Sequence, residues 1–462
     1  MKRLLCIFLI AAILILCCAC GELGNSSADS EQLTYWYSTQ CMDNMVETIE
    51  RYNRWCGSHS TEEMKIKLIE FDDSTAMNEK LNVEVMSGNG PDLFSNYMNL
   101  PFEKLMQNGA FLDLNRLIEN DASDDRIDLN NYNQTVMDAG VNNGKRYCVP
   151  LFYRVDVLIG EEKDFKRFNM PTEQGFHLTF ENMDEVFSDY LREPDGYYVL
   201  CKEGWNGSMN ADTVIFKLIN SHVDFENRCI LFNDDFKAEL ELLSKLREHS
   251  DVSFMELMNN PDFYTDNPLL FDGFNAYSNP IWMERTMGTP TDPDDEENAS
   301  NPILYTCFEM DENTFSAGIV DAIFVNANTK KDDKVLAFLK YLLGEHLQNL
   351  YAGTSKEYWY GGGADCLPVL NSAFENMIQD AYNINDDEGR PVGKKDTLSP
   401  VTQALIDYIG NINEVFLYSN LYLSYYDNYV VSPILQEFWD GKISIDKCIE
   451  NLTSATKIYI EE

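Results

Sequence analysis

Three cysteines near the start of the chain have a spacing that suggests chemistry. Cys17, Cys18 and Cys20 stand in LILCCACGEL (residues 14–23), where Cys17 and Cys20 have the C-x-x-C spacing of a redox or zinc pair. No second ligand pair lies nearby, and an unbroken apolar run (residues 4–16) directly precedes the cysteines. The run is shorter than the roughly 20 residues of a spanning helix. With two basic residues before it and small residues after it, the run is typical of a secretory signal.

The segment around Cys20 resembles a bacterial lipoprotein signal, which is cut before a cysteine that then carries lipid. Ala19 fits the small residue at the cut, whereas Cys17 stands where this class usually has Leu. We therefore expect residues 1–19 to be a signal peptide, Cys20 to be lipidated (palmitate), and residues 20–32 to be a flexible tether. Such an anchor would hold the exported protein at the outer face of the cytoplasmic membrane. An uncleaved anchor and a metal site remain alternatives.

The rest of the chain lacks the motifs of common catalytic sites. Its five histidines form no H-E-x-x-H, and neither a G-x-S-x-G elbow nor a phosphate-binding glycine loop is present. The glycine triplet 361–363 lacks the lysine of such a loop, and the acidic loop 289–302 lacks the glycine turn of a calcium site. We predict a protein that is not an enzyme and has no cofactor or metal. A glycosidase with two catalytic carboxylates stays open, because 77 acidic residues are available.

The net charge and the cysteine content further limit the class of protein to which the chain can belong. The formal net charge is −42, and 44% of the residues are hydrophobic. Such a surface repels nucleic acid and anionic headgroups, while the apolar content suffices for a large core. Eight cysteines follow Cys20. The first two of them, Cys41 and Cys56, flank a predicted helix whose length would hold them about 22 Å apart. Because a disulfide needs Cα atoms within about 7 Å, we predict that Cys41 and Cys56 are unpaired, and pairing among the other cysteines stays open.

The pattern of apolar residues alternates between strands and helices in the first half. Strands are predicted at 33–38 and 64–71 with a helix between them, followed by a helix over 75–87 and a short strand at 90–94. This alternation is typical of an α/β sheet with parallel strands. Further along, Pro150 interrupts an apolar run, which indicates an edge strand or a crossing between lobes.

The second half contains fewer clear signals. Residues 172–260 are predicted to be helical with strand pieces, and residues 318–326 form a predicted strand. Residues 332–351 carry one apolar face and predict a single amphipathic helix. The last sixty residues include a predicted helix over 445–459.

In order and content, these segments resemble an extracellular solute-binding protein of the family 1 type, the sugar-binding lipoproteins of ABC importers. The resemblance rests on TYWYS, IERYN, KIKLIEF, LNVEVMSGNGPDLF, LMQNGAFLDLNRLIE, NGKRYCVPLFY, GIVDAIFVNANTKKDDKVLAFLKYLLGEHLQNLY, LPVLNSA and FWDGKISIDKCIENL, between residues 33 and 462. The usual Gly-Lys-Ala-Ala-Met stretch of the family is not recognisable. FDGFNAYSNPIWM lies near its place, so the solute class stays open.

The resemblance implies a two-lobed periplasmic-binding-protein-like α/β fold (type II), with a doubly wound sheet and flanking helices in each lobe and a hinge between them. We expect residues 33–150 and 318–365 in lobe 1, and residues 151–317 and 366–462 in lobe 2. Solute would bind in the cleft and favour closure by touching both lobes.

Some candidate ligand residues lie at the ends of predicted strands, where open α/β sheets bind their ligands. Trp205 and Asn206 lie in a glycine-flanked loop, Trp282 and Tyr426 come from the second lobe, and Trp359 and Tyr360 precede a glycine triplet. Aromatic rings and polar groups suit sugars, which present both hydroxyl groups and flat C–H faces. Each candidate also has a structural interpretation, as a core or surface residue. The candidates are Trp36, Ser38, Thr39, Asn96, Tyr97, Tyr153, Arg154, Trp205, Asn206, Trp282, Trp359, Tyr360 and Tyr426.

We therefore predict the monomeric, lipid-anchored substrate-binding subunit of an ABC importer, with permease subunits as partners and no nucleic acid. The solute is expected to be a mono- or oligosaccharide, with a peptide, a polyamine or another polar solute as alternatives. A secreted glycan-active enzyme and a surface scaffold or adhesin remain the other functional hypotheses.

Overall fold

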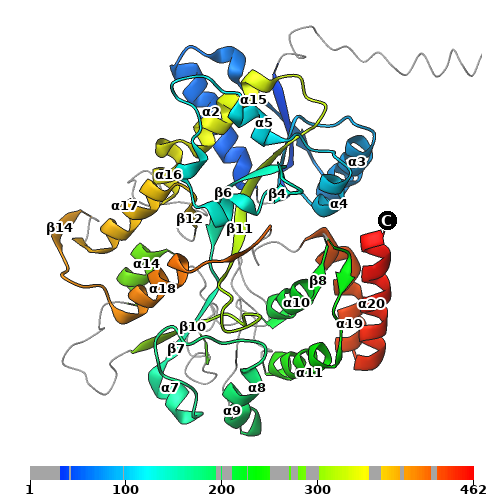
Figure 1. Ribbon diagram of the computed structural model, residues 1–462, viewed down its shortest axis with the longest axis vertical. Helices are drawn as coiled ribbons and strands as arrows, with labels where there is room; N and C mark the ends of the chain where they lie inside the picture. Colours follow the sequence, from blue (N-terminus) through cyan, green and yellow to red (C-terminus); the bar gives the residue numbers. More distant parts are fainter. Residues whose placement is uncertain are drawn as a thin grey trace, which may run out of the picture.

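A computed structural model describes residues 32–40, 43–96, 98–193, 199, 211–225, 227–249, 270–271, 279–287, 301–352, 366–385, 390–417 and 424–461. They form a mixed α/β fold with two lobes, the first at the top of Figure 1 and the second at the bottom and lower right. Long strands run from one lobe toward the other through the middle of the molecule (Figure 1). This two-lobed α/β architecture is the one that the sequence predicts.

The first lobe is organised by a mixed sheet with the order β12-β6-β11-β3-β1-β2, with β15 paired to β11. β1 runs parallel to β2 and β3, whereas β11 runs antiparallel to β3 and β6. Its strands are β1 (Leu33–Ser38), β2 (Ile66–Phe71), β3 (Leu93–Ser95), β6 (Cys148–Arg154), β11 (Ser316–Val325), β12 (Leu367–Pro368) and β15 (Glu414–Phe416).

Helices around this sheet bury their apolar faces in the first of two hydrophobic clusters. Asp43 and Asp73 cap two of the helices by accepting hydrogen bonds from backbone N–H groups in the first turn. The helices are α2 (Asn44–Ser58), α3 (Ser74–Met86), α4 (Phe102–Gln107), α5 (Leu114–Glu119), α6 (Gln134–Asp138), α14 (Pro280–Thr286), α15 (Asp332–Leu343), α16 (Glu345–Tyr351), α17 (Asn371–Ala381) and α18 (Pro400–Gly410).

The second cluster belongs to a mainly helical body around the antiparallel pair of β7 and β10. Its elements are β7 (Val157–Glu161), α7 (Glu162–Arg167), α8 (Met183–Val186), α9 (Ser188–Arg192), α10 (Ala211–Ser221), α11 (Asp234–Glu248), β10 (Pro302–Thr306), the π-helical turn η4 (Asp427–Val431), α19 (Ser432–Trp439) and α20 (Ile445–Glu461). Short hairpins and turns complete the fold: η1 (Glu62–Met64), η2 (Leu129–Asn131), β4 (Val141–Asn142), β5 (Lys145–Arg146), β8 (Val223–Asp224), β9 (Cys229–Ile230), β13 (Asn383–Asn385) and β14 (Pro391–Lys394).

Several local predictions can be compared directly with these elements. Pro150 lies within β6, and the chain continues from β6 through residues 155–156 into β7 of the second lobe. Of the two predicted alternatives, an edge strand or a crossing between lobes, the structure shows the crossing. The single helix predicted over residues 332–351 is wrong, because Gly344 adopts an extended conformation and separates α15 from α16. The predicted division of the chain assigns residues 366–462 to lobe 2, whereas α17 and α18 pack in the first cluster.

The cysteines in the described part of the chain are free, which agrees with the prediction for Cys56. Cys56 is among them and is buried at the end of α2; the others are Cys148, Cys229, Cys307, Cys366 and Cys448. Cys41 lies outside the described residues, as does Cys20 with the predicted signal and tether. No helix within the described ranges has the length and apolar character needed to cross a bilayer.

Candidate functional site

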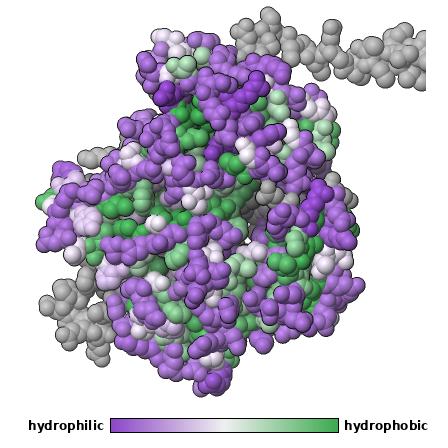
Figure 2. Space-filling view, in the orientation of Figure 1, coloured by the Kyte–Doolittle hydropathy of each residue, from purple (hydrophilic) through white to green (hydrophobic). Residues whose placement is uncertain are grey.

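A cavity of about 590 Å³ lies between the two lobes. In the space-filling view, the outer ends of the molecule are mainly hydrophilic and hydrophobic side chains gather around its middle (Figure 2). Lobe 1 contributes the start of β11, β15, β4 and α4 to the wall, while lobe 2 contributes α10, β8 and the start of η4. A ligand in this cavity would therefore contact both lobes.

One face of α10 forms much of the wall on the side of lobe 2. Thr213, Phe216, Lys217 and Asn220 are spaced by three and four residues, so they share one side of the helix and line the cavity. Residues on the other side, including Leu218, pack in the second hydrophobic cluster. The helix thus carries an apolar face for the core and a mixed face for a ligand.

The opposite wall comes from the sheet of lobe 1. Ser316, Ala317 and Gly318 of β11 pair in parallel with Glu414, Val415 and Phe416 of β15, and all six line the cavity. Because β11 runs antiparallel to β3, its first residues lie at the edge of the sheet where β1 and β3 end. The cavity thus lies at the sheet edge from which the sequence predicts ligand contacts.

A buried polar group, here named the hinge cluster (Lys217, Glu309, Ser316 and Tyr408), connects α10, β11 and α18 beside the cavity. Lys217 Nζ donates to Glu309 Oε2 at 3.1 Å and to the Cys307 carbonyl at 2.7 Å. Tyr408 Oη and Ser316 Oγ both donate to Glu309 Oε1. Burial lowers the pKa of Lys217, but Glu309, Cys307 and Asp156 together more than offset this effect, so the pKa is raised and the lysine stays charged.

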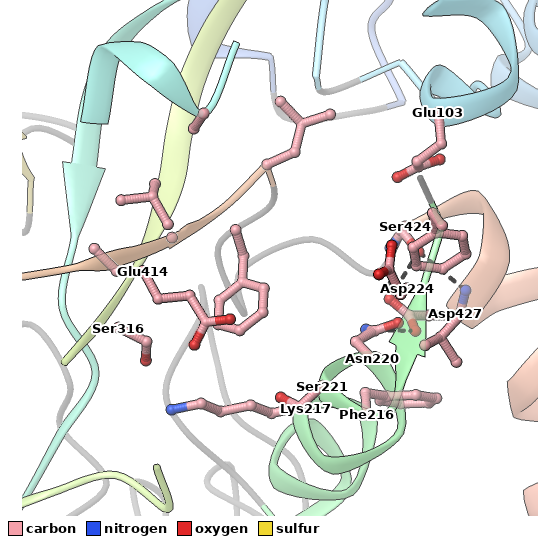
Figure 3. Close-up of a pocket in the computed structure, with 18 of the residues that line it drawn as sticks. Glu103, Phe216, Lys217, Asn220, Ser221, Asp224, Ser316, Glu414, Ser424 and Asp427 are labelled. Carbon is pink, nitrogen blue, oxygen red and sulfur yellow. Dashed lines mark hydrogen bonds between the residues drawn. The ribbon is translucent and has the colours of Figure 1, made fainter. Parts of the chain in front are cut away.

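The far end of the cavity carries carboxylates from both lobes. Figure 3 shows Glu103 extending from α4 toward the group of Asp224, Ser424 and Asp427. Asp427 accepts hydrogen bonds from Asn220 Nδ2 at 3.0 Å and from Ser424 Oγ at 2.8 Å. Burial raises the pKa of Asp427 to about 6. The pKa of Glu103 is raised to about 7, mainly by burial and also by the charge of Asp427.

The rest of the cavity wall contains aromatic rings and one polar atom that has no hydrogen-bond partner among the described residues. Phe216, Phe225 and Phe416 line the cavity. Ser221 Oγ is buried there and has no hydrogen-bond partner among the residues that the structure describes. Carboxylates, amides, a hydroxyl and aromatic rings in one enclosed space can bind a polar organic solute.

None of the eight predicted ligand residues that the structure describes is among those that line this cavity. Asn96 is buried and bridges the bulge of β11, where its amide donates to the Val320 carbonyl and accepts from Ala322 N–H. Tyr153 is buried in the first cluster and Tyr426 in the second, where its hydroxyl bonds that of Thr456 at 2.6 Å.

Trp36, Ser38, Thr39 and Trp282 are the other described candidates. Trp36 is largely buried, lies tilted against Phe71 with ring centroids 5.1 Å apart, and has the Lys80 ammonium 5.0 Å from its ring centre. Ser38 is buried at the end of β1, next to the exposed Thr39, and accepts from Gln40 N–H. Trp282 is half-buried in α14.

Tyr426 also contacts the wall residue Phe225, with ring centroids 5.3 Å apart. Arg154 contacts a second residue of the wall. It is buried and forms an ion pair with Asp156, which lines the cavity. Tyr97, Trp205, Asn206, Trp359 and Tyr360 lie outside the described residues.

The cavity residues that the sequence reasoning missed had a partial signal. Lys217 interrupts the apolar run of residues 214–219 in α10, and Asn220 follows that run. Buried charges are retained mainly where they are paired or functional. No comparable signal marks Glu103 or Asp427 among 77 acidic residues. Within the described ranges, no group of three His, Cys, Asp or Glu side chains has the geometry to hold a metal ion.

Comparisons with known proteins give the same picture of the fold. Residues 47–359 match the family model described as bacterial extracellular solute-binding protein. No curated protein matches the chain significantly.

Solved structures with the same fold cover nearly the whole chain. A chitin oligosaccharide binding protein has a TM-score of 0.58 at 14% identity, over 94% of this chain and 100% of that chain. An ABC substrate-binding protein from Listeria monocytogenes, in complex with cycloalternan, has a TM-score of 0.53 at 13% identity, over 92% and 97%. A solute-binding protein of an ABC transporter from Agrobacterium vitis S4, with bound D-mannitol, has a TM-score of 0.53 at 13% identity, over 93% and 98%.

Proposed function

Because the chain belongs to the bacterial extracellular solute-binding proteins, we propose that it captures a carbohydrate in the cavity between its lobes and delivers it to an ABC importer. The observation that carries this proposal is the cavity itself, which both lobes line and whose volume of about 590 Å³ is in the usual range for small-molecule sites. The protein has a binding role and no catalytic role in this proposal.

The chemistry of the wall supports a carbohydrate. Sugar hydroxyl groups can donate to carboxylates such as Glu414 and Asp427, while the C–H faces of the rings can pack against Phe216 or Phe416. Oligosaccharides are the named ligands of several proteins with this fold. A ligand that touches α10 on one side and β15 on the other favours the closed arrangement of the lobes, because only that arrangement makes both sets of contacts.

Delivery to a permease and attachment to the membrane complete the proposal. We propose that Cys20 carries the lipid and that residues 20–32 form the tether. We keep four residues as proposed further ligand contacts: Trp36, Thr39, Tyr97 and Trp205. Trp359 and Tyr360 do not directly follow a predicted strand. Metabolic labelling with an alkyne fatty acid tests the anchor: the wild type should incorporate label and Cys20→Ser should not. Equal labelling of the two would contradict this assignment.

The binding proposal is tested by a thermal-shift screen against a panel of saccharides, followed by calorimetry. A ligand specific to the folded state raises the melting temperature. Ser221→Trp places a large ring in the cavity and should lower the affinity at least about tenfold, or about 1.4 kcal/mol. The matched control is Ser454→Trp, on the exposed side of α20. Equal affinity of the two variants, or no binding of any saccharide, would contradict the proposal.

A further inference from the structure

The helix α4 of lobe 1 contacts lobe 2 at the end of the cavity opposite the hinge cluster. Figure 3 shows Glu103 of α4 and Lys217 of the hinge cluster on opposite sides of the cavity. α4 lies between β3 and α5, which both belong to lobe 1, so its contacts with lobe 2 do not result from a crossing of the chain. In Figure 1, α4 lies close to the C-terminal end of α20.

Polar side chains of α4 make these contacts with lobe 2. The Lys104 ammonium lies 4.2 Å from the centre of the Tyr459 ring, which is a cation–π contact. Gln107 Nε2 donates to the Phe225 carbonyl at 3.2 Å, and Tyr459 Oη donates to Glu103 Oε2 at 3.5 Å. Because residues 103, 104 and 107 share one side of the helix, they meet lobe 2 together.

A further bond between the lobes precedes the helix. Asn99 Nδ2 donates to the Tyr429 hydroxyl at 3.2 Å, and the Tyr429 ring lies tilted against that of Tyr425, with centroids 4.7 Å apart. Tyr429 is 56% exposed, so this bond is made at the molecular surface. The segment 99–107 therefore joins the two lobes from the cavity wall to the surface.

The contact between α4 and lobe 2 is polar, whereas each lobe keeps its own apolar core. Phe102, Leu105 and Met106 on the other side of α4 are buried in the first cluster, and Tyr459 packs in the second. Interfaces between domains that move relative to each other are more polar than permanent interfaces. Separation of α4 from lobe 2 would therefore leave both cores intact.

α4 also forms part of the cavity wall. Glu103 and Met106 line the cavity, as does Phe225 of lobe 2, whereas Lys104 and Gln107 are not among the lining residues. Loss of the contacts of Lys104 and Gln107 would therefore open the cavity toward solvent without removing a side chain from its wall.

We propose that the segment 99–107 is a latch, which holds the lobes closed in the ligand-free protein and opens to admit the solute. For a solute that binds the closed arrangement, the apparent Kd equals the intrinsic Kd divided by the closed fraction. The latch keeps the closed fraction high, because its contacts are made within the protein before any solute is present. This inference goes beyond the proposed function and does not depend on the class of solute.

The test measures the radius of gyration of the ligand-free protein by small-angle X-ray scattering. The latch variant is the double substitution Lys104→Met, Gln107→Ala. The control variant, Lys447→Met, Gln436→Ala, changes the same residue types at exposed positions whose side chains bond within lobe 2. The wild type and the control should match the closed structure, and the latch variant should have a larger radius of gyration.

Affinity gives a second readout, measured by calorimetry with the saccharide of the thermal-shift panel that raises the melting temperature most. Because neither substituted residue lines the cavity, the lower closed fraction alone should weaken binding to the latch variant, by at least about threefold. The control variant should bind this saccharide as tightly as the wild type does.

The outcomes separate the latch from the proposed function. Equal radii of gyration for the wild type and the latch variant, whether compact or expanded, would overturn the inference, as would full affinity in the latch variant. If no saccharide of the panel binds, the proposed function fails and the scattering alone decides on the latch. If the double variant does not fold, Tyr429→Ala, at an exposed position, replaces it in both measurements.

Discussion

Glu309 and Glu103 are both glutamates between the lobes, yet their surroundings differ sharply. Glu309 is fully buried and receives hydrogen bonds from Lys217, Ser316 and Tyr408. Glu103 lies across the cavity and has one long bond to Tyr459 together with an unfavourable interaction with Asp427. One carboxylate is thus compensated by three donors of the protein, whereas the other has one long hydrogen bond and a raised pKa.

The difference separates a structural role from a binding role. A buried charge with an internal partner contributes to the geometry of the hinge, because removing its partner would leave an unpaired charge in the interior. A carboxylate that repels its neighbour raises the free energy of the empty state. A ligand that relieves the repulsion gains that free energy on binding.

The largest effect is expected when the hinge cluster loses its negative charge. Glu309→Gln leaves the Lys217 ammonium buried without a counter-charge and should lower the free energy of unfolding by about 3–5 kcal/mol, as measured by urea denaturation. The double variant Lys217→Met, Glu309→Gln removes both charges and should recover much of the loss. A single variant as stable as the wild type would show that the pair is not needed.

A smaller effect is expected at Asn96, whose amide is used entirely within the fold. Asn96→Ala removes two hydrogen bonds at the β11 bulge and leaves the Val320 carbonyl and the Ala322 N–H unsatisfied, so stability should fall by about 2 kcal/mol. Saccharide affinity measured well below the melting temperature should not change. A loss of affinity with unchanged stability would instead assign Asn96 to the ligand.

The smallest effect concerns the ligand-free protein with Glu103→Gln. The folded-state pKa of Glu103, about 7, lies above the unfolded value of about 4.3, so the folded state binds more protons. The stability of the wild type therefore falls as the pH rises through this interval. The variant should melt about 2 °C higher than the wild type at pH 8 and at the same temperature at pH 4. A lower melting temperature at pH 8 would mean that the carboxylate is compensated.

The sequence predicted much of the first lobe because its elements are amphipathic and regular. The strand at 33–38, the helix after it and the strand ending at Phe71 all form close to their predicted limits. The predicted alternation of parallel strands did not extend to β11, which runs antiparallel to β3 and β6. Strand direction depends on where a distant segment enters the sheet, and residue 316 follows the whole of β7 to β10.

The candidate site was harder to predict because it is assembled from distant segments. Strand ends correctly indicated an edge of the sheet, but the residues that line the cavity there come from the start of an antiparallel strand and from β15. Tyr153 and Tyr426 have the composition expected of a sugar platform and are instead packed in the two cores. A side chain's burial depends on tertiary packing, which residue type and local spacing do not determine.

The most direct test of the account is a crystal structure of the protein grown with the saccharide that gives the largest thermal shift. The account predicts density for the sugar in the cavity between α10 and β15, in contact with Asn220 or Asp427 on one lobe and with Glu103 or Glu414 on the other. Density for a saccharide bound elsewhere, or in contact with one lobe alone, would contradict it.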